Sequence, residues 1–153
     1  MNKFLWAGII TCFSIAQAFA ADVEVTQAWA RATAPGQDSA AVAMQITSAQ
    51  DANIISVSSS ASSSAEIHSM VHENGMMIMR ALDLLPLKAN QEVSLGADGN
   101  HLMLIGLKKP LKQGDSVTLM ITVEFADKHT EKVKVKALVK ALTTGHEEHQ
   151  HHH

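Results

Sequence analysis

Apolar residues along most of this chain occur in short runs, and inside many runs they alternate with polar residues. Alternation with a period of two is typical of β-strands, because successive side chains point to opposite faces of the sheet. Clusters of glycine, asparagine and proline separate the runs and favour turns. The pattern predicts nine strands, over residues 23–29, 41–47, 53–58, 65–71, 76–82, 91–95, 101–107, 116–125 and 131–139.

Short strands at close spacing favour an all-β fold over an alternation of helices and strands. We therefore expect a Greek-key antiparallel β-sandwich that forms one domain over residues 21–142, since no proline, glycine or charge run divides that region. The cluster Glu73-Asn74-Gly75 predicts a hairpin turn. The serine-rich stretch over residues 58–64 is of low complexity, and we interpret it as a connection without chemistry.

Residues 1–20 have the pattern of a secretory signal peptide. A short positive region ends at Lys3, residues 4–13 are almost entirely apolar, and Ala18-Phe19-Ala20 is an Ala-x-Ala cleavage signal. We expect cleavage after Ala20, export to the periplasm and no membrane span after signal removal; a retained anchor is the alternative. Cys12 lacks a small residue before it, so we do not expect it to carry a lipid.

Composition narrows the chemistry further. Cleavage would remove Cys12, which is the chain's one cysteine, so the mature protein would have neither a disulfide nor a thiolate ligand. The net charge is −3 at pH 7 and the sequence shows no basic patch, which gives no support to a nucleic-acid partner. Aromatic residues make up only 4% of the chain, so aliphatic residues and methionine must build the core. Methionine therefore has two roles to consider, core packing and metal binding.

Two short blocks combine imidazole with thioether side chains. His101 and Met103 are two residues apart, so on a strand both project from the same face. His68 lies on an earlier predicted strand, and the hairpin turn would bring Met79 back toward it. Thioether sulfur is soft and neutral and favours Cu(I) over harder divalent ions, while imidazole adds affinity. These four residues are the candidate ligands of an exposed Cu(I) site.

The choice of methionine ligand remains open at this point. Met70 and His72 share a strand face with His68. We favour Met79 as the ligand and interpret Met70 and His72 as residues that lie beside the site, but another hairpin register would put Met70 in the place of Met79. The methionines over residues 76–79 are also consistent with ordinary core packing.

The four candidate ligands are separated by ten, twenty-one and one residues, a spacing that resembles the His-x10-Met-x21-His-x-Met motif of the PCuAC family of periplasmic copper chaperones. The likeness extends to residues 29–36, 41–44, 66–68, 75–80, 99–104 and 110–115. It implies a cupredoxin-like sandwich that binds one Cu(I) through His68, Met79, His101 and Met103. It also implies delivery of copper for assembly of the cytochrome c oxidase copper centre, with Sco-type thioredoxin-fold proteins and oxidase subunit II as acceptors.

The carboxyl terminus carries a second group of metal ligands. Residues 143–153 contain no apolar side chain, so we expect a disordered tail. Its nitrogen and oxygen donors suit Cu(II), Ni(II) or Zn(II) better than Cu(I). Glutamate and glutamine interrupt the histidines, which favours a native tail over a purification tag. The histidines are His146, His149, His151, His152 and His153.

Enzyme classes fit these residues poorly. A blue-copper electron carrier needs a cysteine thiolate, a histidine-brace monooxygenase needs histidine where Ala21 is expected, and a hydrolase needs a nucleophile elbow. We therefore expect a copper carrier rather than an enzyme. Two alternatives are a periplasmic storage or resistance protein for copper or divalent metals, with the tail as its main site, and a structural or adhesive sandwich.

Overall fold

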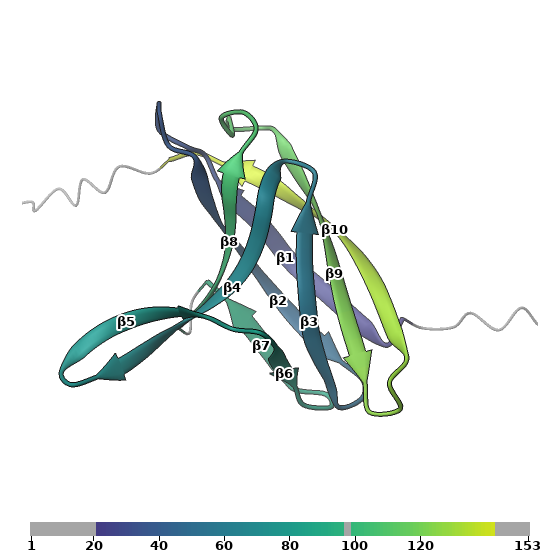
Figure 1. The fold of residues 1–153 in the computed structure, drawn as a ribbon. Coiled ribbons are helices and arrows are strands. Elements are labelled where there is room, and N and C mark those ends of the chain that lie inside the picture. Colours follow the sequence, from purple (N-terminus) through teal and green to yellow (C-terminus); the bar gives the residue numbers. More distant parts are fainter. Residues whose placement is uncertain (1–20, 97–98, 143–153) are drawn as a thin grey trace, which may run out of the picture.

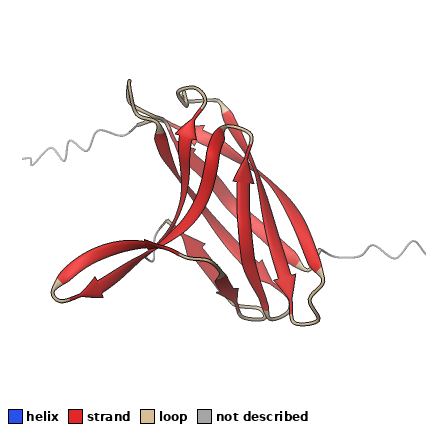
Figure 2. Cartoon of the chain, in the orientation of Figure 1, coloured by secondary structure: helices blue, strands red, loops and turns tan. Residues whose placement is uncertain are grey.

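The computed structural model describes residues 21–96 and 99–142, so the predicted signal peptide and tail lie outside the described residues (Figure 1). Within these ranges the chain forms ten strands and no helix (Figure 2). Accordingly, the described part offers no helix that could cross a membrane. The strands are β1 (Val23–Arg31), β2 (Ser39–Ser48), β3 (Ala52–Ser59), β4 (Ser62–Glu73), β5 (Met76–Ala81), β6 (Leu85–Leu87), β7 (Glu92–Leu95), β8 (Asn100–Leu107), β9 (Ser116–Phe125) and β10 (Thr130–Lys140).

The strands form one sheet that curls round on itself (Figure 1). Its order is β5-β4-β8-β2-β1-β10-β9-β3-β6; β7 pairs with β2, and an additional pairing of β4 with β3 closes the sheet. The pairing of β1 with β10 is parallel, and the other strand pairings are antiparallel. The prediction of an all-β sandwich is confirmed, with this one parallel pairing as a refinement.

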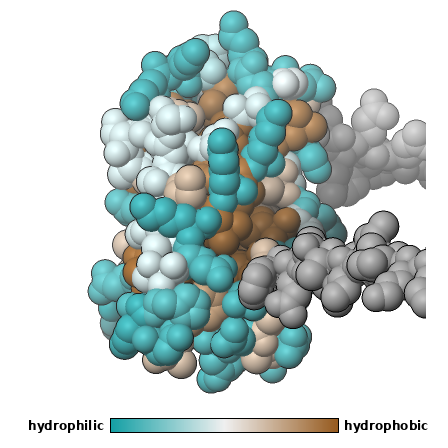
Figure 3. Space-filling view, turned by 90° about the vertical axis from the view of Figure 1, so that its right-hand side faces the viewer, coloured by the Kyte–Doolittle hydropathy of each residue, from teal (hydrophilic) through white to brown (hydrophobic). Residues whose placement is uncertain are grey.

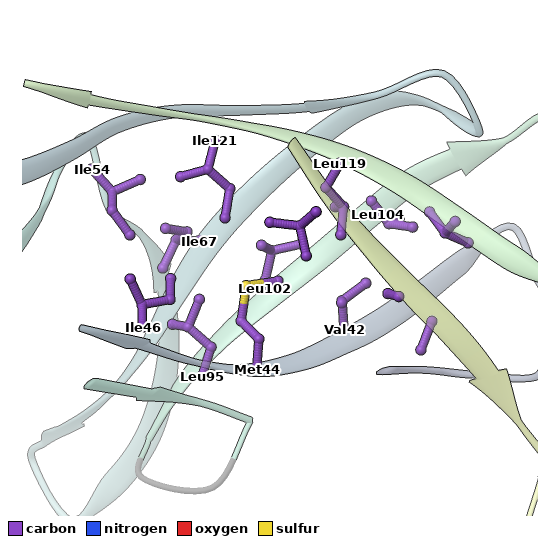
Figure 4. Packing of buried hydrophobic residues seen from close by; sticks show 14 of the residues in the cluster. Val42, Met44, Ile46, Ile54, Ile67, Leu95, Leu102, Leu104, Leu119 and Ile121 are labelled. Atoms are coloured by element: carbon purple, nitrogen blue, oxygen red, sulfur yellow. The ribbon is translucent and has the colours of Figure 1, made fainter. Parts of the chain in front are cut away.

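Alternate residues of the strands build the core. In β9, for example, Leu119, Ile121 and Val123 are fully buried, while the residues between them are partly exposed. Figure 4 shows Met44 of β2 and Leu102 of β8 in the same interior as Leu119 and Ile121. Met44 is the one buried methionine among the described residues. Core packing therefore does not explain the methionines of β5.

Two details of the strand prediction were wrong. The serine-rich stretch is not a connection, because β3 continues to Ser59 and β4 begins at Ser62. Its hydroxyls find backbone acceptors: Ser59 Oγ donates to the carbonyl oxygen of Thr118 at 2.8 Å, and Ser62 Oγ to that of Ser64 at 2.9 Å. The second error is β6, which was missed because it has three residues and contains a proline, and so carries almost no alternation.

The outer face of β10 carries a row of positive charge. Exposed lysines occupy alternate positions there, while the intervening residues from Val135 to Val139 point into the core. The side of the molecule that carries β9 and β10 in Figure 1 is seen in Figure 3, and hydrophilic side chains cover much of it. These charges do not form a contiguous run in the sequence, because each lysine is separated from the next by other residues, so the prediction of no basic patch is wrong for this face. The lysines are Lys132, Lys134, Lys136 and Lys140.

A hairpin of β4 and β5 stands away from the rest of the sheet (Figure 1). The first part of the twelve-residue β4 pairs with β8, and this pairing ends where the Met70 amide donates to the carbonyl oxygen of Gly99. Beyond that point β4 pairs with β5 alone. Asn74 and Gly75 close the hairpin with φ values of 51° and 78°, the positive values that a two-residue type I′ turn requires. We call residues 69–81 the arm.

Candidate metal site

The candidate ligands of β4 and β8 meet across a strand pair. His68 lies directly opposite His101 in the antiparallel register. Met103 is two residues further along β8, so it projects from the same face as His101. The intervening Leu102 is fully buried, as is most of Ile67 beside His68. The histidines and Met103 therefore lie on the outer face of the sheet, and we call this side of β4, β5 and β8 the ligand face.

Met79 and Met70 form the next row of the ligand face. They lie directly opposite each other in the β4–β5 register, whereas His68 is opposite Ala81. Met79 is therefore diagonal to His68, and its side chain is 49% exposed. Because β4 runs between β5 and β8, about two strand spacings, or about 10 Å, separate the backbone of Met79 from β8. Met70, on the middle strand, is one spacing closer to β8.

Glu66 is a neighbour of His68 that the sequence analysis missed. The Nε2–H of His68 donates to Glu66 Oε2 at 2.8 Å, and the His68 side chain is 19% exposed. A carboxylate that accepts from one nitrogen of a metal-binding imidazole fixes its tautomer and orientation. With Nε2 held in this way, Nδ1 is the nitrogen that keeps its lone pair for a metal. The two-residue spacing on a predicted strand could have indicated this contact.

His72 lies at the outer end of the ligand face. It is opposite Met77, and both side chains are exposed. His72 is thus separated from His68 by the row of Met70 and Met79. The structure brings His68, His101 and Met103 onto neighbouring strands, and it places the remaining thioethers and His72 further along the arm.

A groove of about 400 Å³ adjoins the site on the side of β2. His101 and Met103 form part of its wall, and Trp29 and Arg31 of β1 form another part. The Nζ atom of Lys140 lies 4.8 Å from the centroid of a Trp29 ring, which is within the range of a cation–π contact. The groove therefore combines small apolar residues with Arg31 and two candidate ligands, and Lys140 contacts its Trp29 wall.

A different group of donors lies at the β9–β10 turn, far from the arm in Figure 1. Asp22, His129 and Glu131 each offer one donor atom, and these atoms lie within 4.8 Å of one another. The Nδ1 atom of His129 contacts the carboxylate of Asp127, and its ring stacks on Phe125 with centroids 4.4 Å apart. The hydrogen bond from His129 lowers the pKa of Asp127. Oxygen and imidazole donors suit divalent ions rather than Cu(I).

Comparison with known proteins places the chain in a family. The family described as "Putative lipoprotein LpqE-like" matches residues 23–137. The protein named Putative lipoprotein Lxx21020, from Leifsonia xyli subsp. xyli, is 33% identical over 114 residues, which cover 74% of this chain and 68% of that protein.

Solved structures with the same fold include PCuAC domains and a Cu(I)-bound protein. The solution structure of CuI-DR1885 from Deinococcus radiodurans is 30% identical, with a TM-score of 0.58, and the match covers 80% of this chain and 83% of that one. The copper-bound PCuAC domain from PmoF2 has a TM-score of 0.62, and the match covers 79% of this chain and 94% of that domain. At 20% identity the latter shows the fold alone. The cupredoxin-like sandwich fold is therefore confirmed.

Proposed function

The chain belongs to the LpqE-like family, and from that premise we propose that it is a copper chaperone that holds one Cu(I) on the ligand face. His68, Met79, His101 and Met103 are the proposed ligands. The observation that carries the proposal is the register of β4 and β8, which sets His68 opposite His101 with Met103 on the same face. The similarity to CuI-DR1885, a Cu(I)-bound protein by its name, supports copper as the metal.

The donor set suits a carrier. Neutral thioether and imidazole ligands bind Cu(I) without bringing a charge that would favour divalent ions. His101 and Met103 are partly exposed and Met79 is 49% exposed, so an incoming protein can reach the metal. A thiolate of that protein can then replace the neutral ligands one at a time, and copper passes on without a change of oxidation state. No step of this exchange requires a catalytic residue, so we propose a carrier and not an enzyme.

We propose that acceptors approach over the groove. Its position beside His101 and Met103 gives access to two ligands at once, and Arg31 and Lys140 favour an acidic surface on the acceptor. Sco-type thioredoxin-fold proteins and cytochrome c oxidase subunit II are the proposed acceptors. If copper stays on this chain in the presence of a reduced acceptor, the proposed direction of transfer is wrong.

We propose export to the periplasm through the signal peptide over residues 1–20. The names of the matched family and of the Leifsonia relative describe lipoproteins, which supports export. Cys12 and the cleavage site lie outside the described residues, so the absence of a lipid on Cys12 stays a prediction.

A storage or resistance protein is the second candidate function. The five tail histidines favour it, and they lie outside the described residues. In that function divalent ions would bind mainly to the tail, and several would bind per chain. The other alternative is a structural or adhesive sandwich. Core packing of its methionine cluster does not support it, because Met76, Met77 and Met79 are 64%, 54% and 49% exposed.

A Cu(I) competition titration against a chromophoric chelator tests the proposal. The mature protein should bind one Cu(I) tightly, and Met103→Leu should weaken that site about tenfold or more, because even groups that only support metal ligands are worth about 10–100-fold in affinity. Met120→Leu is the matched control, since Met120 is a partly exposed methionine of β9 outside the ligand face. Tight binding that survives Met103→Leu but disappears on removal of residues 143–153 would favour storage by the tail.

The same titration decides whether Met79 or Met70 is the copper ligand. We expect Met79→Leu to weaken the tight site and Met70→Leu to leave it nearly unchanged. The reverse result would assign the ligand to Met70, which lies on the strand next to β8.

A further inference from the structure

The arm exposes methionines that neither the core nor the four proposed ligands explain. None of its residues is buried, and Met76 and Met77 are 64% and 54% exposed. Large apolar side chains on a two-stranded hairpin gain nothing from packing when no other element covers either face. Thioethers at such a place remain available as ligands.

The two faces of the arm differ in chemistry. One face is the continuation of the ligand face, and its rows run outward from His68 through Met70 with Met79 to His72 with Met77. The other face carries an ion pair between Arg80 and Glu73. The arm's one histidine, His72, and three of its four methionines therefore lie on the ligand face.

His72 and Met77 are well placed to share one ion. They are directly opposite each other in the register, so their Cβ atoms are about 4.5–5.5 Å apart. An imidazole nitrogen and a thioether sulfur extended from such a pair can reach opposite sides of one small ion. The absence of a negative charge in this row makes the pair suited to a soft monovalent ion rather than to a divalent one.

We propose that His72 and Met77 form a second, outer Cu(I) site at the end of the arm. The inference rests on the proposed function only in taking Cu(I) as the ion. With two donors instead of four, the outer site binds more weakly than the inner site and fills after it. Successive rows are about 7 Å apart along the strand. The row of Met70 and Met79, which supplies the inner ligand Met79, lies between His68 and the outer pair.

This arrangement gives copper a path along the arm. A bond from Cu(I) to the sulfur of Met79 or Met70 forms as the bond to His72 breaks. In the next exchange a bond to His68 forms as the bond to Met77 breaks. All donors on the path are neutral and copper remains Cu(I), so the transfer needs neither an oxidant nor a reductant. The outer site would thus load the inner one.

Methionine-methyl NMR of the full chain, titrated with Cu(I) under anaerobic conditions, tests the inference. The tail contains no methionine, so copper bound there does not move these signals directly. We expect the first equivalents to shift the Met103 methyl signal and later ones to shift that of Met77. His72→Asn should abolish the Met77 shift and leave the Met103 shift unchanged.

Met76→Leu is the matched control, because Met76 is the more exposed methionine of the same hairpin but lies on the other face. This variant should keep both shifts, and the buried Met44 methyl signal reports that each variant is folded. An unmoved Met77 signal, or one that still moves in His72→Asn, would overturn the outer site. An unmoved Met103 signal would instead overturn the proposed inner site.

Discussion

The sandwich and the arm share one strand and yet differ in what that strand does. In the sandwich, β4 alternates between Ile67, which is 6% exposed, and the outer His68. In the arm the same alternation continues, but Val71 is 38% exposed because no second layer covers it. An alternating pattern therefore determines which residues share a face, and the elements packed against a face determine whether it is buried.

The largest expected effect is a difference in how much stability is lost when a side chain is shortened in the sandwich or in the arm. Leu119 of β9 is fully buried, so Leu119→Ala should cost about 2–5 kcal/mol in the free energy of unfolding. Met77→Ala, in the exposed arm, should change it by less than about 0.5 kcal/mol. Urea denaturation of both variants measures the contrast. Similar costs would mean that the arm packs against another part of the protein.

Copper should reduce the difference in amide exchange rate between the arm and the sandwich. Without copper, amides of β5 should exchange with solvent faster than those of β9, because local opening of the arm exposes no buried core. If opening the arm releases Cu(I), copper at a hundred times its dissociation constant should slow exchange in β5 about a hundredfold. Hydrogen exchange followed by NMR measures this. The same slowing in a Met103→Leu variant would argue against the proposed inner site.

Two glycines with positive φ should respond differently to alanine. At Gly96, φ is +103° and an added Cβ would lie 2.9 Å from Ala43 Cβ and 3.3 Å from its Cα, so Gly96→Ala should cost about 1–3 kcal/mol of global stability through overpacking. At Gly75, φ is +78° and nothing lies within 4 Å. Gly75→Ala should therefore weaken only the hairpin turn. Thermal unfolding should detect the first change, and exchange in β5 the second.

The smallest expected effect is a change of stability with pH, which arises from Asp127 in the sandwich. The hydrogen bond from His129 lowers the pKa of Asp127 below its ordinary value of 3.8. A carboxyl whose pKa is lower in the folded state stabilises the fold above its unfolded pKa, and this contribution is lost as the pH falls through the folded value. Because Asp127 is fully exposed, the loss should be slight. Carboxyl NMR titration of the native protein and of His129→Gln measures the shift, which should disappear in the variant.

Much of the site could be predicted from the sequence because it depends on local rules. His101 and Met103 share a face since they are two residues apart on a strand, and the turn at Asn74 and Gly75 follows from their tolerance of positive φ. Both predictions are confirmed. The assignment of His68, Met79, His101 and Met103 as copper ligands stays a prediction, as does the role of the tail.

Other features depend on contacts between distant parts of the chain. Asp22 meets His129 and Glu131 only because β1 and β10 are neighbours in the sheet. The lysines of β10, by contrast, share a face by the two-residue period of their own strand, which the sequence contains. The meeting of Asp22 with His129 and Glu131 is not contained in any local pattern.

The sequence by itself determined the strands other than β6, their alternation, and that His101 and Met103 share a face, because these follow from the two-residue period of a single strand. Only the tertiary structure decided that His68 is opposite His101 and that the methionines of β5 are exposed. Register and burial arise between strands, and a shift of one residue in pairing would move every side chain to the other face.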